Sequence, residues 1–417
     1  MTPSTQAAGK SAERIVYFDW LKFLVVYGIV VYHTALPFSY TSWLIESRDR
    51  SLVLTAFTAF TFPWGIPLLF LLSGAGEYFG LRSRPVGSFV LRRILRLGLP
   101  FVIGLVLLSP LQAYFVGVAR RNVSGMLHYY PQFIRGLKLD LTPMWLGHVG
   151  YHLWFLIYLL VITLATLPLM EWLRSLGGRQ AVARLAAFSH RRGGILVFAI
   201  PLAVSQLLLR DRFPNYRDWA DVATYFLVFV AGYVLVSDRA FTTAIERNVG
   251  VTLVLGVVST VVVGLLLFAA NHNLLTGSPT VQLLNHVIFN VFWSLNVWCW
   301  CLNLLYLGVR WLTRGDRILA YGNESALPVY IISHPVIVIL GSYVVFWNLP
   351  LWPRFLVLTG LSFAGILAIY ELGVRRWNPT RFLFGLKPLP RRPHSMVAHP
   401  VHAFARRLHS AIGTNGT

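Results

Sequence analysis

Long apolar stretches recur along almost the whole chain, and short polar or glycine- and proline-containing segments separate them. Most of these stretches approach or exceed the ~20 residues that a helix needs to cross the hydrocarbon core of a bilayer. Because they are continuously apolar instead of alternating, they do not fit the strands of a closed barrel. The pattern predicts an all-α, polytopic membrane helix bundle of about ten transmembrane helices. We expect these helices at about 16–37, 53–79, 92–118, 151–171, 194–209, 220–236, 250–270, 282–309, 325–346 and 354–375.

Composition supports a membrane protein. The chain has 417 residues, of which 56% are hydrophobic and 12% charged, and its mean hydropathy is +0.63; a soluble domain carries about 25% charged residues. The net charge of +21 would fit a nucleic-acid partner. However, the Lys and Arg residues lie mainly between the predicted helices, which favours the bilayer as the partner and not nucleic acid. The two cysteines, Cys299 and Cys301, lie in the apolar "WCWC" and predict packing.

The distribution of basic residues predicts the orientation. With the N-terminus inside, 26 of the 36 Lys and Arg residues fall at the inner ends of the predicted helices. The positive-inside rule therefore places both termini in the cytoplasm. The predicted organisation is a cytoplasmic N-terminal segment (1–14), a transmembrane domain (15–377) and a basic cytoplasmic tail (378–417). We expect this tail to be mobile or bound to the membrane surface.

The first predicted helix carries ionisable residues in "DWLKFLVVYGIVVYH". An ionisable side chain at membrane depth costs roughly 2.5–3.5 kcal/mol and usually faces protein or water. Lys22 and His33 are eleven residues apart, so they share one helix face at about 16 Å along the axis. Asp19 is placed to pair with Lys22. We expect this face to border a conduit, although a Lys22 that reaches the interface and a His33 in the core would also fit.

The third predicted helix opens with "FVLRRILRLGLPF", which contains Arg92, Arg93 and Arg96. Arg93 and Arg96 are three residues apart and lie on one helix face at the predicted inner end. Guanidinium groups bind phosphate in a bidentate manner, so this pair predicts a phosphate site. A positive-inside cluster on lipid headgroups is the alternative.

The second helix contains "GIPLLFLLSGAGEYF", in which Ser73, Gly74 and Gly76 allow a neighbouring helix to approach closely. Glu77 could form a salt bridge with a neighbouring arginine. Packing is the simpler interpretation of this segment.

The fourth helix begins near "HVGYHLWFLIYLL". His148 and His152 have i, i+4 spacing, but no acidic third ligand lies at a useful distance, so no metal site is predicted. Trp154 fits an aromatic-belt position.

The last two helices carry further polar groups. In "YIISHP", His334 precedes Pro335, which predicts a kink. In "AIYELGVRRW", Glu371 lies one turn before Arg375 and predicts a structural ion pair or a site residue.

Together these motifs resemble membrane acyltransferase family 3, and within it the glucan biosynthesis protein C branch of periplasmic glucan succinyltransferases. The resemblance covers roughly 14–387 in consistent order. Its motifs are Lys22 to His33, Arg93 to Arg96, "FLLSG" at 70–74, "HLWFL" at 152–156, "YIISHP" at 330–335 and "IYEL" around Glu371.

The resemblance implies transfer of a succinyl or acetyl group from cytoplasmic acyl-CoA to a carbohydrate hydroxyl, such as that of a glucan, outside a bacterial inner membrane. No bound cofactor is expected. His33 would be the general base. The remaining roles follow from the matched motifs: acyl-CoA binding by Arg92, Arg93, Arg96 and Lys22, and channel or site support by Asp19, Ser73, His152, Trp154, His334 and Glu371.

Two features add to this expectation. The segment 119–150 is rich in aromatic and polar residues, so we expect it to contact an external substrate. The sequence shows no nucleophilic serine motif, which favours direct transfer over an acyl-enzyme intermediate.

Two other functions fit the same pattern. A transporter or flippase for an acylated or anionic molecule would place Lys22 and His33 along its path. A scaffold that binds lipids or a partner through its basic tail would leave that pair unexplained. The sequence leaves the acyl group, the acceptor and the oligomeric state open.

Overall fold

The structure is a computed structural model, and it describes residues 16–119, 125–137, 142–143, 150–272, 274–275 and 277–389. Within these ranges the chain is helical and contains no strand, which confirms the predicted all-α class. One compact unit ends at Leu386. Its longer helices are α1 (Val16–Ala35), α2 (Leu52–Arg82), α3 (Val86–Arg93), α4 (Leu99–Leu107), α5 (Ser109–Ala119), α6 (Met126–Arg135), α8 (Trp154–Arg174), α9 (Leu176–Ser189), α10 (Ala199–Leu209), α11 (Trp219–Ser237), α12 (Ala240–Asn271), α13 (Pro279–Trp311), α14 (Arg317–Val344) and α15 (Leu351–Ala368).

Short helical segments join or extend these helices: η1 (Leu36–Phe38), η2 (Ile94–Gly98), η3 (Tyr151–Leu153), η4 (Gly194–Phe198), η5 (Ile369–Val374) and α16 (Asn378–Leu383). Two of them, η2 and η5, are π-helical and lie inside the third and last predicted spans.

Nine helical segments of the described chain are long and apolar enough to cross a membrane. The fifth predicted span is also helical but shorter, at Gly194–Leu209. Its 3₁₀ turn and α-helix together extend about 26 Å, slightly less than the ~30 Å hydrocarbon core.

The ends of this short helix lie at opposite ends of the bundle. Before it, the Gly193 backbone N–H donates to Asn248 Oδ1 (2.7 Å) in the first part of α12. After it, Asp211 pairs with His286 near the start of α13 (2.9 Å). Helices α12 and α13 are antiparallel neighbours, because Thr252 bonds Asn303 and Thr260 bonds Asn296. The segment η4–α10 therefore runs from one end of the bundle to the other, as the tenth crossing predicted from the sequence requires.

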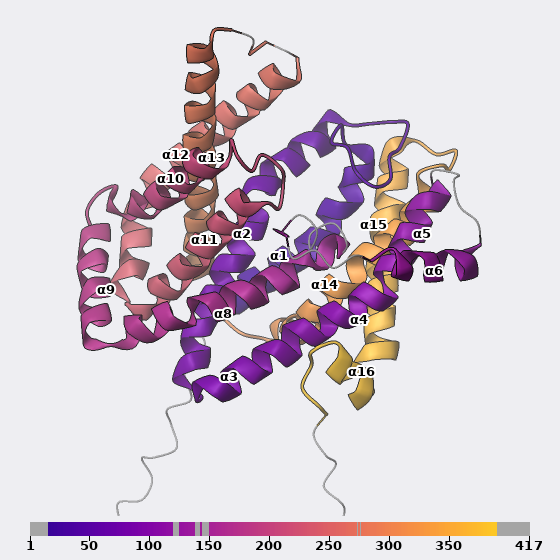
Figure 1. Ribbon diagram of the computed structural model, residues 1–417, viewed down its shortest axis with the longest axis horizontal. Helices are drawn as coiled ribbons and strands as arrows, with labels where there is room; N and C mark the ends of the chain where they lie inside the picture. The colour runs from indigo at the N-terminus through magenta and orange to yellow at the C-terminus, as the bar shows by residue number, and fades with distance from the viewer. Residues whose placement is uncertain are drawn as a thin grey trace, which may run out of the picture. The chain divides into compact units, whose positions relative to one another are not determined.

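Helix α14 lies at the centre, in contact with α1 and α15 (Figure 1). It runs parallel to α1: Phe23 packs on Gly322, Tyr27 bonds Ser325 (2.8 Å), and farther along, His33 contacts His334. In its most apolar window α14 is 78% buried, whereas α12 is 17% buried. Helix α14 is thus internal, and α12 presents most of its surface to lipid.

Helix α15 runs antiparallel to α1, as the contacts Thr34–Thr359 (2.9 Å) and Tyr27–Phe363 show. The start of α1 and the end of η5 consequently lie at the same end of the bundle. We call this end, which also contains Arg93 and Arg96, the basic end, and the opposite end the histidine end. Which end faces the cytoplasm stays a prediction.

Close contact between α2 and α11 confirms the predicted packing role of one glycine in the second span. A Cβ on Gly74 would lie 1.9 Å from the Phe229 carbonyl oxygen, and a Cβ on Gly232 would lie 1.9 Å from that of Leu71. Only glycine allows two backbones to approach so closely. In contrast, a Cβ on Gly76 would have no atom of a neighbouring helix within 4 Å.

Candidate active site

Three histidines from distant parts of the sequence meet at the histidine end. His33 comes from α1, His152 from η3 and His334 from α14. The ring centroids of His33 and His334 are 4.9 Å apart, and those of His152 and His334 are 4.8 Å apart in a parallel stack. Trp43 packs on both His33 (6.1 Å) and His334 (5.5 Å). We call His33, His152 and His334 the histidine cluster.

His152 is bound to α14 because Pro335 leaves a carbonyl group available. Proline has no N–H, so Pro335 cannot make the helical bond to the Ile331 carbonyl. His152 Nε2 takes that place and donates to the Ile331 oxygen at 3.0 Å. In addition, the Tyr330 hydroxyl donates to the His152 carbonyl. The "YIISHP" and "HLWFL" motifs thus bind each other.

Gln112 of α5 holds His334. Its side-chain amide donates to the Leu108 carbonyl (3.2 Å), so its Oε1 atom faces His334 Nδ1 at 2.5 Å. A carbonyl oxygen only accepts hydrogen bonds. The His334 proton therefore lies on Nδ1, and its Nε2 carries the lone pair. By the same argument the His152 proton lies on Nε2.

His33 points into the protein and contacts the other rings instead of lipid. The residue is half-buried. In the described chain, His33 Nδ1 and His152 Nδ1 are buried and have no hydrogen-bond partner. Nε2 of His33 and Nε2 of His334 do not belong to this group of atoms. Because Nδ1 of the half-buried His33 is enclosed, Nε2 is the nitrogen of this ring that can face a substrate. The conduit that we expect between Lys22 and His33 stays a prediction.

Two residues beside the histidine cluster have a backbone conformation that is rare outside glycine. Tyr151 (φ 50°) and Arg217 (φ 68°) are the non-glycine residues with positive φ in the described chain. They contact each other, because Arg217 Nη1 donates to the Tyr151 carbonyl (3.2 Å). The Tyr151 ring lies 6.4 Å from His334. Such strain costs roughly 1–3 kcal/mol and is concentrated at functional sites.

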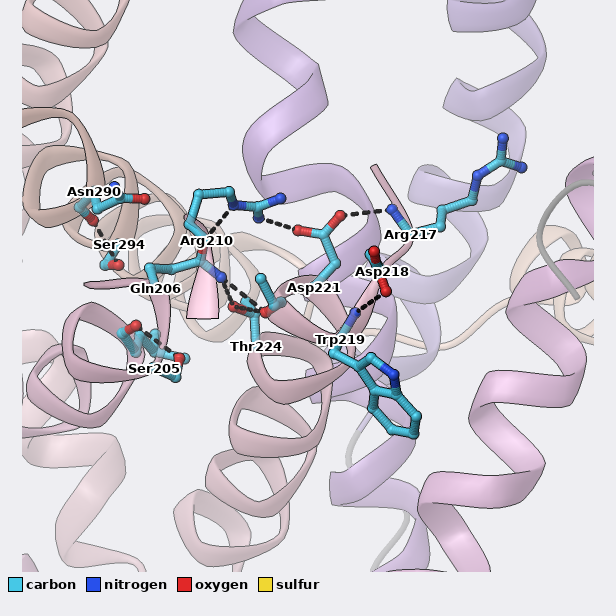
Figure 2. Close-up of polar contacts among 12 residues, drawn as sticks. Ser205, Gln206, Arg210, Arg217, Asp218, Trp219, Asp221, Thr224, Asn290 and Ser294 are labelled. Carbon is cyan, nitrogen blue, oxygen red and sulfur yellow. Dashed lines mark hydrogen bonds and ion pairs between the residues drawn. The ribbon is translucent and has the colours of Figure 1, made fainter. Parts of the chain in front are cut away.

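A buried network holds the Arg217 backbone in this conformation (Figure 2). Asp221 accepts from the Arg217 N–H (2.7 Å) and also pairs with Arg210. The Tyr158 hydroxyl donates to the Arg217 carbonyl (2.6 Å). The Arg217 side chain extends away from Asp221 and lies over the rings of Trp154 and Tyr216.

At the basic end, the predicted arginines surround a π-helical turn. Arg93 is half-buried with its guanidinium 5.2 Å from the Phe89 ring, whereas Arg92 and Arg96 are exposed. Segment η2 begins directly after Arg93 and contains Arg96. Turns of this kind are rare and occur frequently at functional sites. The exposed guanidinium groups fit a phosphate-bearing ligand.

Glu77 of α2 does not form the salt bridge that the sequence left open as the alternative to packing. It is fully buried, and neither carboxylate oxygen has a hydrogen-bond partner in the described chain. The packing interpretation of this segment therefore fits the structure, because the Glu77 side chain is enclosed between helices.

The second π-helical segment, η5, carries Glu371. Arg375 Nη1 binds the Glu371 carboxylate at 2.9 Å, as the sequence predicts, and Arg375 also approaches Glu324 (3.7 Å). Arg381 of α16 is buried and binds Glu324 at 2.7 Å. These ion pairs fix α16 to the basic end.

The turn after α16 reaches the arginines. Gly385 has φ 70°, and a Cβ there would lie 2.7 Å from the Arg96 carbonyl and 2.9 Å from the Leu327 side chain. Arg96 and Leu327 are therefore at one level. Leu327 precedes His334 by seven residues on α14, or about 10 Å along the helix axis. The level of Arg96 and the level of the histidine cluster are therefore separated by about two turns of α14.

Comparison with known proteins identifies the family. The family described as an acyltransferase domain matches residues 15–371. The chain belongs to acyltransferase family 3. Its relatives include proteins named glucans biosynthesis protein C from Salmonella paratyphi A, Salmonella agona and Salmonella dublin, each 24% identical over 397 residues, which are 90% of this chain and 96% of the relative. No solved structure matches the chain.

In this acyltransferase, Trp154 does not occupy the predicted aromatic belt. Only 5% of its surface is exposed, and its ring packs on Tyr158 and Tyr225 inside the bundle. A belt residue would face the lipid interface. Trp154 instead supports Arg217 beside the histidine cluster.

The other predicted residues have separate positions. Ser73 donates to the Leu69 carbonyl of its own helix (2.7 Å), so its hydroxyl is engaged within α2. Asp19 and Lys22 lie in the first two turns of α1, and their roles stay predictions. In the described ranges, no three His, Cys, Asp or Glu side chains are arranged to hold a metal, and His148 lies outside those ranges.

Two residues beside the histidine cluster of this acyltransferase, Gln112 and Arg217, are not among those predicted from the sequence. Gln112 is a single amide within the apolar "LSPLQAYF". A buried amide requires partners, so this position carried a signal that was available from the sequence. Arg217 carried none, since its importance comes from its backbone conformation and from contacts with distant residues.

Proposed function

We propose that this protein is a membrane O-acyltransferase that moves a succinyl or acetyl group from acyl-CoA to a carbohydrate hydroxyl. The observation that supports it most is that α1 and α14 connect an arginine-rich end with a histidine cluster. The family supports acyl transfer. The names of the relatives, which refer to glucans, support a carbohydrate acceptor such as a glucan.

The donor binds at the basic end. Arg93 and Arg96 hold the CoA phosphates, with Arg92 and Lys22 adding positive charge, because guanidinium forks match phosphate oxygens. The acyl-bearing arm of CoA then extends along the Lys22–His33 face of α1. The thioester reaches the histidine cluster, about 10 Å farther along α14 than the level of Arg96.

The acceptor enters from the histidine end. His33 Nε2 takes the proton of the attacking hydroxyl, whose oxygen forms the new C–O bond with the thioester carbonyl carbon. The C–S bond breaks, and the CoA sulfur takes the proton from His33. No acyl-enzyme intermediate is required. Cys299 and Cys301, the chain's two thiols, are buried in α13.

The distribution of basic residues supports a cytoplasmic basic end, because the positive-inside rule favours Lys and Arg there. Acyl-CoA would then bind from the cytoplasm of a bacterium, and the acceptor would come from outside its inner membrane. Both termini would be cytoplasmic.

The test uses proteoliposomes that contain the full chain. Acyl-CoA with a labelled acyl group is supplied on one side and a purified envelope glucan on the other. We expect label on the glucan, in an ester that mild base removes. If the acylated or anionic cargo crosses the bilayer unmodified and no label is transferred, the protein is a transporter and the proposal is overturned.

A further inference from the structure

We propose that Gln112 is a positioning residue that fixes His334 as a hydrogen-bond acceptor for His33 during acyl transfer. The proposal rests on the function proposed above and adds two residues to its mechanism. It predicts a chain of three groups from α5, α14 and α1: the Gln112 carbonyl, the His334 imidazole and the His33 imidazole.

The first link is fixed by hydrogen bonding. Gln112 is fully buried, and its amide N–H donates to the Leu108 carbonyl, so the side chain cannot rotate to exchange its oxygen and nitrogen without losing that bond. Its Oε1 therefore accepts from His334 Nδ1 at 2.5 Å. As a result, His334 presents an unprotonated Nε2.

The second link joins His334 to His33. Their rings are in contact at 4.9 Å and nearly perpendicular, without a hydrogen bond in the resting state. His33 Nδ1 is buried and has no partner in the described chain, while Nε2 is accessible. Catalytic hydrogen bonds are often loose in the free enzyme and tighten during reaction. When His33 becomes an imidazolium, its buried Nδ1–H requires an acceptor, and His334, whose ring contacts it, carries a lone pair on Nε2 that can supply one.

The proton balance stays that of direct transfer. The hydroxyl proton moves to His33 Nε2 and then to the CoA sulfur. His334 gains and loses no proton, because its lone pair only accepts the hydrogen bond from His33. This is the role that a carboxylate has beside the histidine of a catalytic triad, where it fixes the tautomer and stabilises the imidazolium.

Several ionisable side chains surround His334. The titratable or charged groups that face it are His33 from α1, Tyr151 and His152 from η3, and Arg217 before α11. None of these supplies a negative charge. The stacked His152 ring also holds the His334 plane.

Three measurements test the proposal. Gln112→Met keeps the side-chain length but removes both polar atoms, whereas Gln112→Glu retains an acceptor for Nδ1–H. For Gln112→Met we expect kcat to fall at least about tenfold with little change in either KM, since loss of the orienting group of a catalytic histidine can cost up to ~10⁴-fold. Gln112→Glu should restore most of kcat and move the acid limb of the pH–rate profile to higher pH, because a carboxylate stabilises a protonated imidazole.

The third measurement does not depend on the Gln112 variants. Nitrogen-15 NMR of histidine-labelled wild-type protein, with His334 assigned by its absence in His334→Asn, should show the Nδ1–H tautomer. Asn303→Leu, a buried amide on α13 bonded to Thr252 of α12, is the control for removing an internal amide. It should keep the wild-type pH profile.

Each result has a distinct meaning. Three results would each overturn the positioning role. They are a wild-type kcat in Gln112→Met, a Gln112→Glu enzyme as slow as Gln112→Met, and an Nε2–H tautomer at His334. Absence of acyl transfer by the wild-type protein would instead overturn the proposed function, and the NMR measurement would still decide whether Gln112 fixes the tautomer.

Discussion

At the scale of single residues, the nature of each hydrogen-bond partner decides what the histidine cluster can do. His152 and His334 each donate to an oxygen that only accepts, from Ile331 and Gln112 respectively. Their protons are therefore on different ring nitrogens, Nε2 in His152 and Nδ1 in His334. His33, whose accessible Nε2 has no such constraint, remains available to take a proton.

Replacement of His33 tests the general base. We expect His33→Ala to lower kcat by about 10²–10⁴-fold, the usual contribution of a positioned base. The amount of protein in the membrane should stay unchanged, because the residue is only half-buried. The initial rate of labelled acyl transfer is the measurement. His272→Ala, at an exposed histidine after α12, is the control, and a His33→Ala enzyme with wild-type rate would exclude the assigned role.

The arginines at the basic end should act on donor affinity. We expect Arg93→Gln and Arg96→Gln each to raise KM for acyl-CoA about tenfold or more with little change in kcat, since a hydrogen bond to a charged group contributes roughly 1.5–3 kcal/mol. Arg50→Gln, which removes an exposed arginine paired with Glu46 outside this cluster, should leave KM unchanged. If the two cluster variants lower kcat alone, these residues do not bind the donor.

At the scale of helices, departures from regular α-helix coincide with the candidate sites. The π-helical segments η2 and η5 carry Arg96 and Glu371, and Pro335 interrupts the hydrogen bonding of α14 beside His334. A regular helix satisfies its own backbone, so it offers no free carbonyl to a neighbour. The interruption at Pro335 is what allows His152 to bind α14.

Replacement of Pro335 tests this explanation. In Pro335→Ala the restored N–H competes for the Ile331 carbonyl, so His152 loses its acceptor. We expect kcat to fall about tenfold to a hundredfold, as small misplacements in an active site can do, without loss of thermal stability. Acyl-transfer kinetics and a thermal melt in detergent measure the two effects. Pro328→Ala, at a buried proline of the same helix, should retain activity; equal losses in both variants would contradict the explanation.

At the scale of the whole molecule, the number of crossings decides which groups can meet. Helices α1 and α14 are parallel, so His33 and His334 are at the same end. Successive crossings alternate in direction, and α1 is the first crossing. A helix parallel to α1 must therefore be an odd-numbered crossing. The short segment Gly194–Leu209 must therefore cross, although its length alone leaves that open.

Cysteine labelling tests that crossing. Arg192 precedes the short segment and Arg212 follows it, and both side chains are exposed. With a membrane-impermeant thiol reagent applied outside intact cells, we expect Arg212→Cys to react and Arg192→Cys to react only after permeabilisation. The native Cys299 and Cys301 are buried, which keeps the background low. Equal reaction of both positions from one side would mean that the segment does not cross.

The sequence by itself determined the class of this protein and much of its chemistry. Continuous apolar stretches can be stable only as membrane helices, so their number and approximate limits followed from composition and length. Lys22, His33, Arg93 and Arg96 were recognisable as candidate site residues, because an ionisable side chain at membrane depth costs free energy and usually has a function. The Glu371–Arg375 pair was predictable as well, since it depends on spacing within one helix.

Only the tertiary structure decided which of these groups act together. His33, His152, His334 and Gln112 are separated by tens to hundreds of residues, and helical periodicity fixes a face but not the helix that it meets. The assignment of Trp154 to the lipid interface failed for this reason. Tautomers and strained backbone likewise depend on partners from other helices, which local pattern does not specify.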